Sequence, residues 1–108
     1  MAFKSIASPS IGTSGSPTTL TAAVGAGQTQ TLIGLAFANI SGANSTVSAK
    51  LNKNGGTSAF LIKDALVLPG GALAVVGGDQ KLVLEQGDTI TAYSSVATSI
   101  DATLSYLV

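Results

Sequence analysis

A strand-turn-strand pattern that occurs twice between residues 66 and 93 constrains the fold of this chain more than any other feature. The first copy reads LVLPGGAL and the second reads LVLEQGDTI, and in each a short apolar run leads through a turn into another apolar run. Proline presets φ, and glycine adopts the positive φ that a tight reversal requires. Two such corners in succession predict stacked antiparallel strands. The residues with this turn and scaffold chemistry are Pro69, Gly70, Gly71, Gly87 and Asp88.

Turn signals divide the rest of the chain into further short strands. Asn54-Gly55 is the favoured dipeptide of a tight hairpin, and Gly77-Gly78-Asp79 supplies an additional turn. No segment has a convincing helical period. About eight short strands in one domain predict an all-β fold, an antiparallel β-sandwich of the jelly-roll or Ig-like kind. Outside the double pattern, strands are expected over 18–24, 28–40, 46–53, 57–66 and 99–108.

The beginning of the chain differs from the rest. Pro9 and Pro17 interrupt pairing, and the Ser, Gly and Thr residues around them offer little to bury. Residues 1–17 are therefore predicted to be an extended N-terminal arm ahead of a β-sandwich domain at 18–108. The apolar residues of the arm either anchor to a neighbouring subunit or begin the first edge strand of their own domain. These residues are Phe3, Ile6 and Ile11.

The surface is predicted to be poor in charge. Only 9% of the residues are charged and the formal net charge is zero, against about 25% charged residues in typical soluble domains. Few charges promote association, which favours a subunit packed against other chains, and a monomer covered in Ser and Thr is the alternative. The C-terminal strand ends apolar and has to dock in a sheet or against a partner. The candidate subunit contacts are Phe3, Ile6, Ile11, Tyr106 and Val108.

Missing residue types exclude several kinds of chemistry. The chain has no cysteine and no histidine, which excludes disulfides, ordinary zinc sites, thiol catalysis and a histidine general base. All five basic residues are lysines, so the planar fork that recognises phosphate and guanine is missing and nucleic-acid binding is not expected. The mean hydropathy is +0.49, but no run approaches the roughly 20 apolar residues of a membrane span. No cofactor is expected.

The acidic residues suggest structural roles. Glu85 and Asp88 flank a glycine turn, where Asp88 is expected to accept hydrogen bonds from the turn backbone while Glu85 stays solvated. Calcium binding by Asp79, Glu85 and Asp88 is the alternative, although the chain lacks a dense acidic loop. Asp64 and the three lysines between residues 50 and 63 are expected to form at most a weak exposed ion pair. No catalytic, cofactor-binding or metal-binding residue is assigned.

Three stretches after about residue 17 carry a resemblance. They are TLIGLAFANISGANSTVSAKL, AFLIKDALVLPGGALAVVGGDQKLVLEQGDTITAYSS and the closing SIDATLSYL. The order of strand, Pro-Gly turn, apolar strand, Leu-Val-Leu-Glu-x-Gly-Asp and final alternating strand resembles the small β-sandwich virion proteins of tailed bacteriophages. The similarity rests on architecture and turns rather than on catalytic residues.

This resemblance implies a non-enzymatic structural subunit present in many copies on a virion. A cement or decoration protein on the outer surface of the capsid is favoured, because the domain is compact and has no long helix or loop. Its partners would be the major capsid protein and copies of itself, with a trimer favoured and multivalent contacts providing retention. A tail, baseplate or head-tail junction component is the alternative. Less favoured is a carbohydrate-binding module, which needs exposed aromatic platforms such as Tyr93 and Tyr106.

Overall fold

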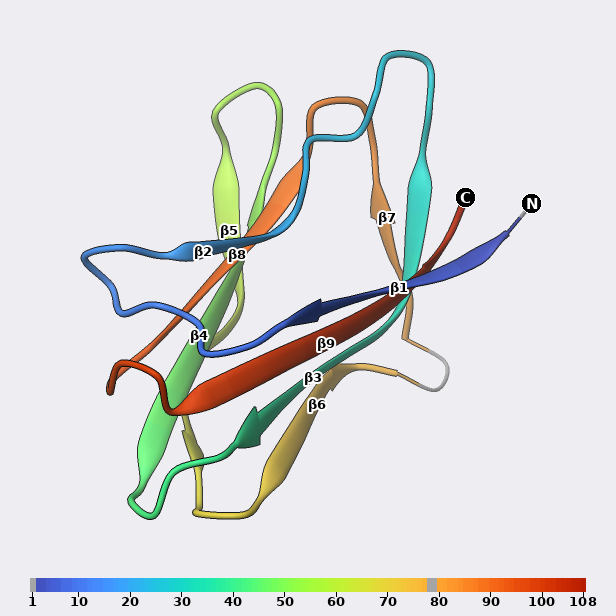
Figure 1. Cartoon of the computed structure of the whole chain (residues 1–108). Coiled ribbons are helices and arrows are strands. Elements are labelled where there is room, and N and C mark those ends of the chain that lie inside the picture. The colour runs from blue at the N-terminus through green and yellow to red at the C-terminus, as the bar shows by residue number, and fades with distance from the viewer. Residues whose placement is uncertain (1, 78–79) are drawn as a thin grey trace.

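The computed structural model describes residues 2–77 and 80–108, and within these ranges the chain forms two packed antiparallel β-sheets without a helix (Figure 1). The predicted all-β fold and β-sandwich are confirmed. Accordingly, the described ranges contain no helix long and apolar enough to cross a membrane. Sheet A contains β1 (Phe3–Ser8), β3 (Gln30–Asn39), β6 (Ala72–Val76), β7 (Leu82–Leu84) and β9 (Ile100–Leu107). Sheet B contains β2 (Thr18–Thr21), β4 (Ser45–Asn52), β5 (Ser58–Val67) and β8 (Thr89–Ser94).

The strands pair as they would in one long hairpin that has been rolled up. From the two chain ends inwards, β1 pairs with β9, β2 with β8, β3 with β6 and β4 with β5. Rolling then places β9 beside β3 and β8 beside β4, which gives the orders β1-β9-β3-β6 and β2-β8-β4-β5. Of the two expected topologies, this order is the jelly roll. The short strand β7 is an addition that pairs with β3.

Both copies of the strand-turn-strand pattern connect the two sheets. The first corner takes the chain from β5 in sheet B through Pro69 and Gly70 to β6 in sheet A. The second takes it from β7 in sheet A through Gly87 to β8 in sheet B. Gly70 has φ of 74° and Gly87 has φ of 82°, so both use the left-handed conformation that glycine tolerates. The corners therefore join the layers rather than neighbouring strands of one sheet.

Alternate residues of the strands fill the space between the sheets. In β8 and β9 the buried side chains recur at every second position, as the period of a strand requires. The central strand β3 instead has only buried or half-buried residues on both faces, which fits its continuous apolar run from Leu32 to Ala38. The largest fully buried apolar side chains are Phe37, Ile11, Leu32, Leu35, Leu84, Ile90, Ile100 and Val47.

The extended arm predicted over residues 1–17 is not observed in its described part, residues 2–17. β1 pairs with β9 along its whole length, and Ile11 is 0% exposed in the core. The Ile11 amide also donates a hydrogen bond to the Ile100 carbonyl at 2.9 Å. The alternative in which these residues begin an edge strand is the one that the structure adopts. Ile11 is thus a core residue and offers no free surface to a neighbouring subunit. Pro9 follows the end of β1 and does not interrupt its pairing.

Strand β4 departs from a regular alternation of buried and exposed residues. In a regular strand Ser48 would face water on the same side as Lys50, yet it is only 1% exposed. The register between β4 and β5 shifts around Ala49, and Asp64 has φ of 50°. The Asp64 amide donates to Ser48 Oγ at 2.9 Å. Because of this irregularity, the backbone of β5 covers Ser48. The Ser48 hydroxyl accepts a hydrogen bond from the Asp64 amide, which has no ladder partner where the register shifts.

Replacing Ile11 with alanine is expected to destabilise the protein by about 2–5 kcal/mol, because it leaves a cavity in the core. Replacing Phe3, which is 76% exposed, is expected to change stability by no more than about 0.5 kcal/mol. Urea unfolding of Ile11→Ala, Phe3→Ala and the wild-type chain at one low protein concentration measures both effects. Equal small effects of the two substitutions would contradict the placement of Ile11 in the core.

Candidate functional site

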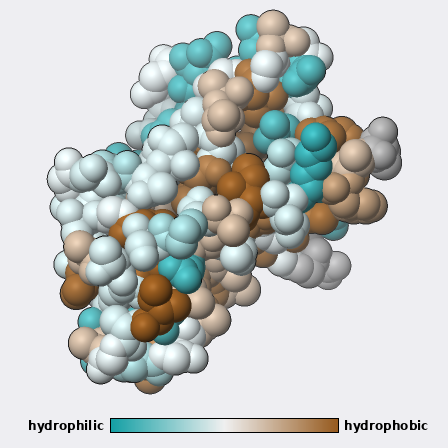
Figure 2. Space-filling view, viewed as in Figure 1, coloured by the Kyte–Doolittle hydropathy of each residue, from teal (hydrophilic) through white to brown (hydrophobic). Residues whose placement is uncertain are grey.

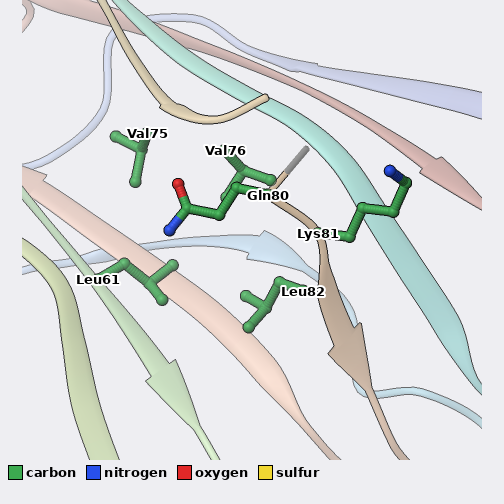
Figure 3. Close-up of a pocket in the computed structure, with 6 residues that line it drawn as sticks. All are labelled: Leu61, Val75, Val76, Gln80, Lys81 and Leu82. Carbon is green, nitrogen blue, oxygen red and sulfur yellow. The ribbon is translucent and has the colours of Figure 1, made fainter. Parts of the chain in front are cut away.

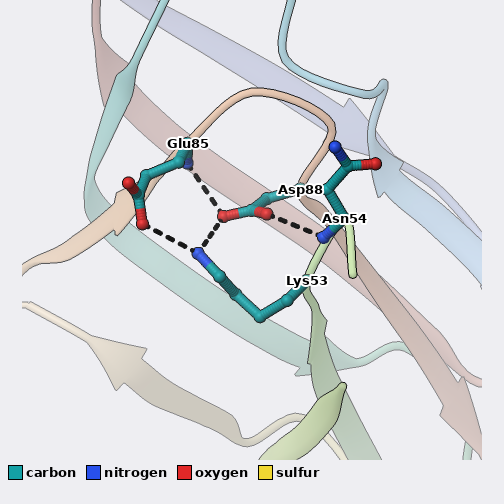
Figure 4. A network of polar contacts seen from close by, with 4 residues as sticks. All are labelled: Lys53, Asn54, Glu85 and Asp88. Atoms are coloured by element: carbon teal, nitrogen blue, oxygen red, sulfur yellow. Dashed lines mark hydrogen bonds and ion pairs between the residues drawn. The ribbon is translucent and has the colours of Figure 1, made fainter. Parts of the chain in front are cut away.

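The most extensive network of charged groups in the described structure joins the β4-β5 hairpin to the second corner (Figure 4). Asp88 lies in the corner and its side chain is 1% exposed. One carboxylate oxygen accepts from the Glu85 amide at 2.9 Å and from the Lys53 ammonium, while the other accepts from the Asn54 amide at 3.1 Å. The same ammonium donates to Glu85 at 3.1 Å. Asp88 thus holds its own turn, as expected, and a second loop in addition.

The charges of this network support each other. The hydrogen bond from Lys53 lowers the pKa of the Asp88 carboxyl below its ordinary value of 3.8, and the amides of Glu85 and Asn54 act in the same direction against the opposing effect of desolvation. The hydrogen bonds to Asp88 and then to Glu85 raise the pKa of Lys53 above 10.5. Both groups therefore stay charged at neutral pH. Lys53, which was expected to form at most a weak exposed pair with Asp64, instead binds a buried carboxylate.

The network holds two loops together. Both oxygens of Asp88 already accept hydrogen bonds, and Glu85 remains largely exposed at 70% of its side chain. Within the described ranges, no group of three or more acidic side chains is placed to hold a metal ion. Asp79, the third member of the calcium site considered from the sequence, lies outside the described residues.

Two of the scaffold glycines, Gly71 and Gly87, lie where a Cβ atom would contact a neighbouring group too closely. A Cβ on Gly71 would lie 3.0 Å from the Leu68 carbonyl oxygen, which accepts a hydrogen bond from the Gly71 amide at 2.8 Å. Gly71 does not have the positive φ that was expected of it. A Cβ on Gly87 would lie 2.4 Å from the side chain of Asn54. Gly87 therefore allows the second corner and the hairpin to approach closely.

Two other lysines gather around an exposed aromatic ring. The ammonium groups of Lys50 and Lys63 lie 5.0 and 5.3 Å from the centroid of the Phe60 ring. Cation-π contacts of this kind contribute modestly at exposed positions. Phe60 is 40% exposed, so the lysines partly cover an apolar group that would otherwise face water.

A small pocket lies between the sheets at the side of the sandwich where β5 faces β6 and β7 (Figure 3). Its volume is about 80 Å³, well below the several hundred Å³ of typical ligand sites. Leu61 and Leu82 lie on one side of it in Figure 3, and the Lys81 side chain points away from the other lining residues. The pocket therefore suits at most a single aliphatic side chain. Its lining residues are Leu61, Val75, Val76, Gln80, Lys81 and Leu82.

An open groove of about 460 Å³ runs beside the two chain ends. Tyr106 contributes to its wall, but this side chain is partly buried and packs against the core. Tyr93 lies on β8 in the other sheet. The two tyrosines thus form no common platform on which a sugar ring could stack. The lining residues of the groove are Lys4, Gln28, Thr29, Gln30, Tyr106 and Val108.

Large apolar side chains are exposed at several places on a weakly charged surface (Figure 2). Three of them, which we call the apolar end, are Ile40, Leu66 and Leu68, at 55%, 58% and 57% exposed. Their backbones belong to one end of the sandwich, because Asn39 donates to the Val67 carbonyl at 2.9 Å and the Gly70 amide donates to Asn39. The sequence analysis placed Leu66 and Leu68 in the first copy of the strand-turn-strand pattern but did not predict their exposure on either side of the buried Val67.

The candidate subunit contacts divide into exposed and packed residues. Phe3 is 76% and Val108 is 45% exposed, and they lie on paired ends of β1 and β9. Ile6 and Tyr106 are partly buried against the core. Phe3 and Val108 therefore offer the larger free surface to a neighbour, whereas Ile6 and Tyr106 mainly support their own domain.

Comparisons of the chain with protein-family models, with curated proteins and with solved structures find no match.

The Asp88 network is expected to make stability depend on pH at the acid end. Because the pKa of Asp88 is lower in the folded state, its contribution is present above the ordinary value of 3.8 and is lost as the pH falls through the folded pKa. Asp88→Asn should unfold at a temperature several degrees lower than wild type at pH 7. The difference should narrow as the pH falls below 3.8 and through the folded pKa, because the wild-type side chain then becomes neutral, as asparagine is at every pH.

Glu85→Gln is the matched control, since an exposed ion pair contributes little. Thermal unfolding followed by circular dichroism between pH 2 and pH 8 measures all three chains. A constant difference between Asp88→Asn and wild type across this range would contradict the proposed role of the charge.

Proposed function

We propose that this protein is a non-enzymatic structural subunit of a bacteriophage virion, a capsid cement or decoration protein that bridges neighbouring major capsid subunits. The proposal begins from the resemblance of its strand and turn order to small virion proteins of tailed phages. The jelly-roll order is compatible with it, because this architecture occurs in viral capsid domains, although it also occurs in lectin domains and cupins. Because one fold can serve many functions, the support for this function comes from the exposed surface.

The apolar end is the observation that carries the proposal. Ile40, Leu66 and Leu68 are each more than half exposed, and the hydrogen-bonded loops that carry them hold them at one end of the sandwich. Burying one such side chain against a partner contributes about 1.5–3 kcal/mol. A capsid subunit that covers this end would gain this free energy at every copy. Repetition over a symmetric particle would convert modest single contacts into firm retention.

The chemistry of the chain supports a structural role rather than a catalytic one. The buried carboxylate of Asp88 is occupied by Lys53 and by two backbone amides. The pocket between the sheets is apolar on most sides and small. The separation of Tyr93 and Tyr106 on different sheets weighs against the carbohydrate-binding alternative. The exposed apolar side chains of the described structure are available for contact with another protein.

Binding to capsids tests the proposal. The purified chain is mixed with capsids of the major capsid protein encoded in the same genome, and cosedimentation and electron cryomicroscopy measure occupancy. We expect symmetric density on the outer surface. Exchanging both leucines in Leu66→Ser/Leu68→Ser should weaken binding about tenfold or more, because it removes apolar surface that is buried on binding.

Val83→Ser is the matched control, because Val83 is 53% exposed but belongs to β7. Its binding should equal that of wild type, and thermal unfolding checks that all variants fold. Density on the tail or at the head-tail junction would support the alternative location. Failure to bind any part of the particle would overturn the proposed function.

A further inference from the structure

Strand β1 is a regular edge strand with little protection against pairing, because its six residues contain no bulge and no proline and only one charged residue, Lys4. It forms one border of sheet A, and its register with β9 runs without a shift from Phe3 to Ser8. The other described edges are short or irregular. β5 is interrupted by register shifts and by the positive φ of Asp64, β2 has four residues with a bulge, β6 has five with a register shift, and β7 has three. Natural proteins use such devices to prevent pairing between sheet edges.

The phase of the ladder identifies which groups of β1 are free. Ala2 and Val108 exchange hydrogen bonds at 3.1 and 3.0 Å, so even-numbered residues of β1 form the hydrogen-bonded pairs with β9. The N–H and C=O groups of the odd-numbered residues point away from β9. These residues are Phe3, Ser5 and Ala7.

We propose that β1 pairs antiparallel with β1 of a second copy of this chain about a two-fold axis at Ser5. In this register Ser5 lies opposite Ser5 of the second copy, and Phe3 lies opposite Ala7 in both directions. Each opposed pair exchanges two hydrogen bonds, so every outward-pointing backbone group of the three residues finds a partner. Sheet A then continues from one copy into the other. The inference rests on the proposed role as an assembly subunit and names one of its partners.

The side chains of β1 fit this pairing. The large Phe3 ring, 76% exposed, lies opposite the small Ala7 of the second copy on the outer face of the sheet. Lys4 lies opposite Ile6 rather than opposite its own equivalent, so like charges do not face each other. A contact of this length buries less than the roughly 1,200 Å² of stable interfaces, so the pair is weak in solution and gains from the many copies of an assembly.

Disulfide trapping tests the pairing directly, because the chain has no cysteine of its own. Ser5→Cys places one thiol on the axis, where opposed Cα atoms lie about 5.5 Å apart, within the range that a disulfide spans. Under mild oxidation we expect about tenfold more linked dimer than for Ser58→Cys, which changes another exposed serine on the β5 edge. Equal linking of the two variants would overturn the proposal.

Ser5→Pro provides a second test. Proline is tolerated at an edge position whose N–H faces away from the sheet, and thermal unfolding confirms folding. Sedimentation equilibrium should give a dissociation constant about tenfold or more above that of wild type, because the central hydrogen bonds are lost. Unchanged association, or a wild-type chain that stays monomeric, would overturn the pairing. If Ser5→Cys forms the linked dimer but does not bind capsids, only the proposed function is overturned. If Ser5→Cys binds capsids but does not crosslink, only the pairing is overturned.

Discussion

The position of β9 between β1 and β3 is the constraint on which the rest of the structure depends. The last strand of the chain uses both of its edges, and its Ile100, Ala102 and Leu104 side chains are buried between the sheets. Without it, β1 would have no partner and the core would lose one wall. Because the ladder joins the two ends of the chain, sheet A is complete only when nearly all residues are available. Folds dominated by such distant pairings form slowly, since loop closure precedes the contacts that reward it.

The corners between the sheets are stabilised by backbone geometry and by one buried charge. Gly70 and Gly87 allow the reversals, and Asp88 connects the second corner to the β4-β5 hairpin through Lys53 and two amides. An unpaired buried carboxylate would be strongly unfavourable, so its partners have to remain in place. The buried carboxylate of Asp88 therefore stabilises the connection between the corner and the hairpin.

The surface that remains determines what kind of function the molecule suits. Its charges are few, its described hollows are small or open, and its exposed large apolar groups include Phe3 on β1, Phe60 on β5 and the apolar end. Exposed apolar groups of this kind are a common feature of surfaces that contact other chains, and this is the basis of the proposed function. The apolar end lies at the loops around Asn39 and Val67, and β1 forms a border of sheet A. In the proposals made above, the first would contact a shell and the second a neighbouring copy.

Local patterns in the sequence were sufficient to predict the strands after residue 17, their approximate ends and a two-sheet sandwich, because a period of two and turn residues act over a few positions. They also predicted that Asp88 holds its turn. They did not predict β1, which was assigned to an extended arm. Only the tertiary structure decided that Pro69 and Gly87 mark crossings between sheets, that Ile11 is in the core and that Lys53 binds Asp88. A turn has the same residues whether its two strands lie in one sheet or in two. The burial of Ile11 and the pairing of Lys53 with Asp88 depend on residues far apart in the chain. Such pairings depend on the burial of the whole core, which no short stretch of sequence encodes.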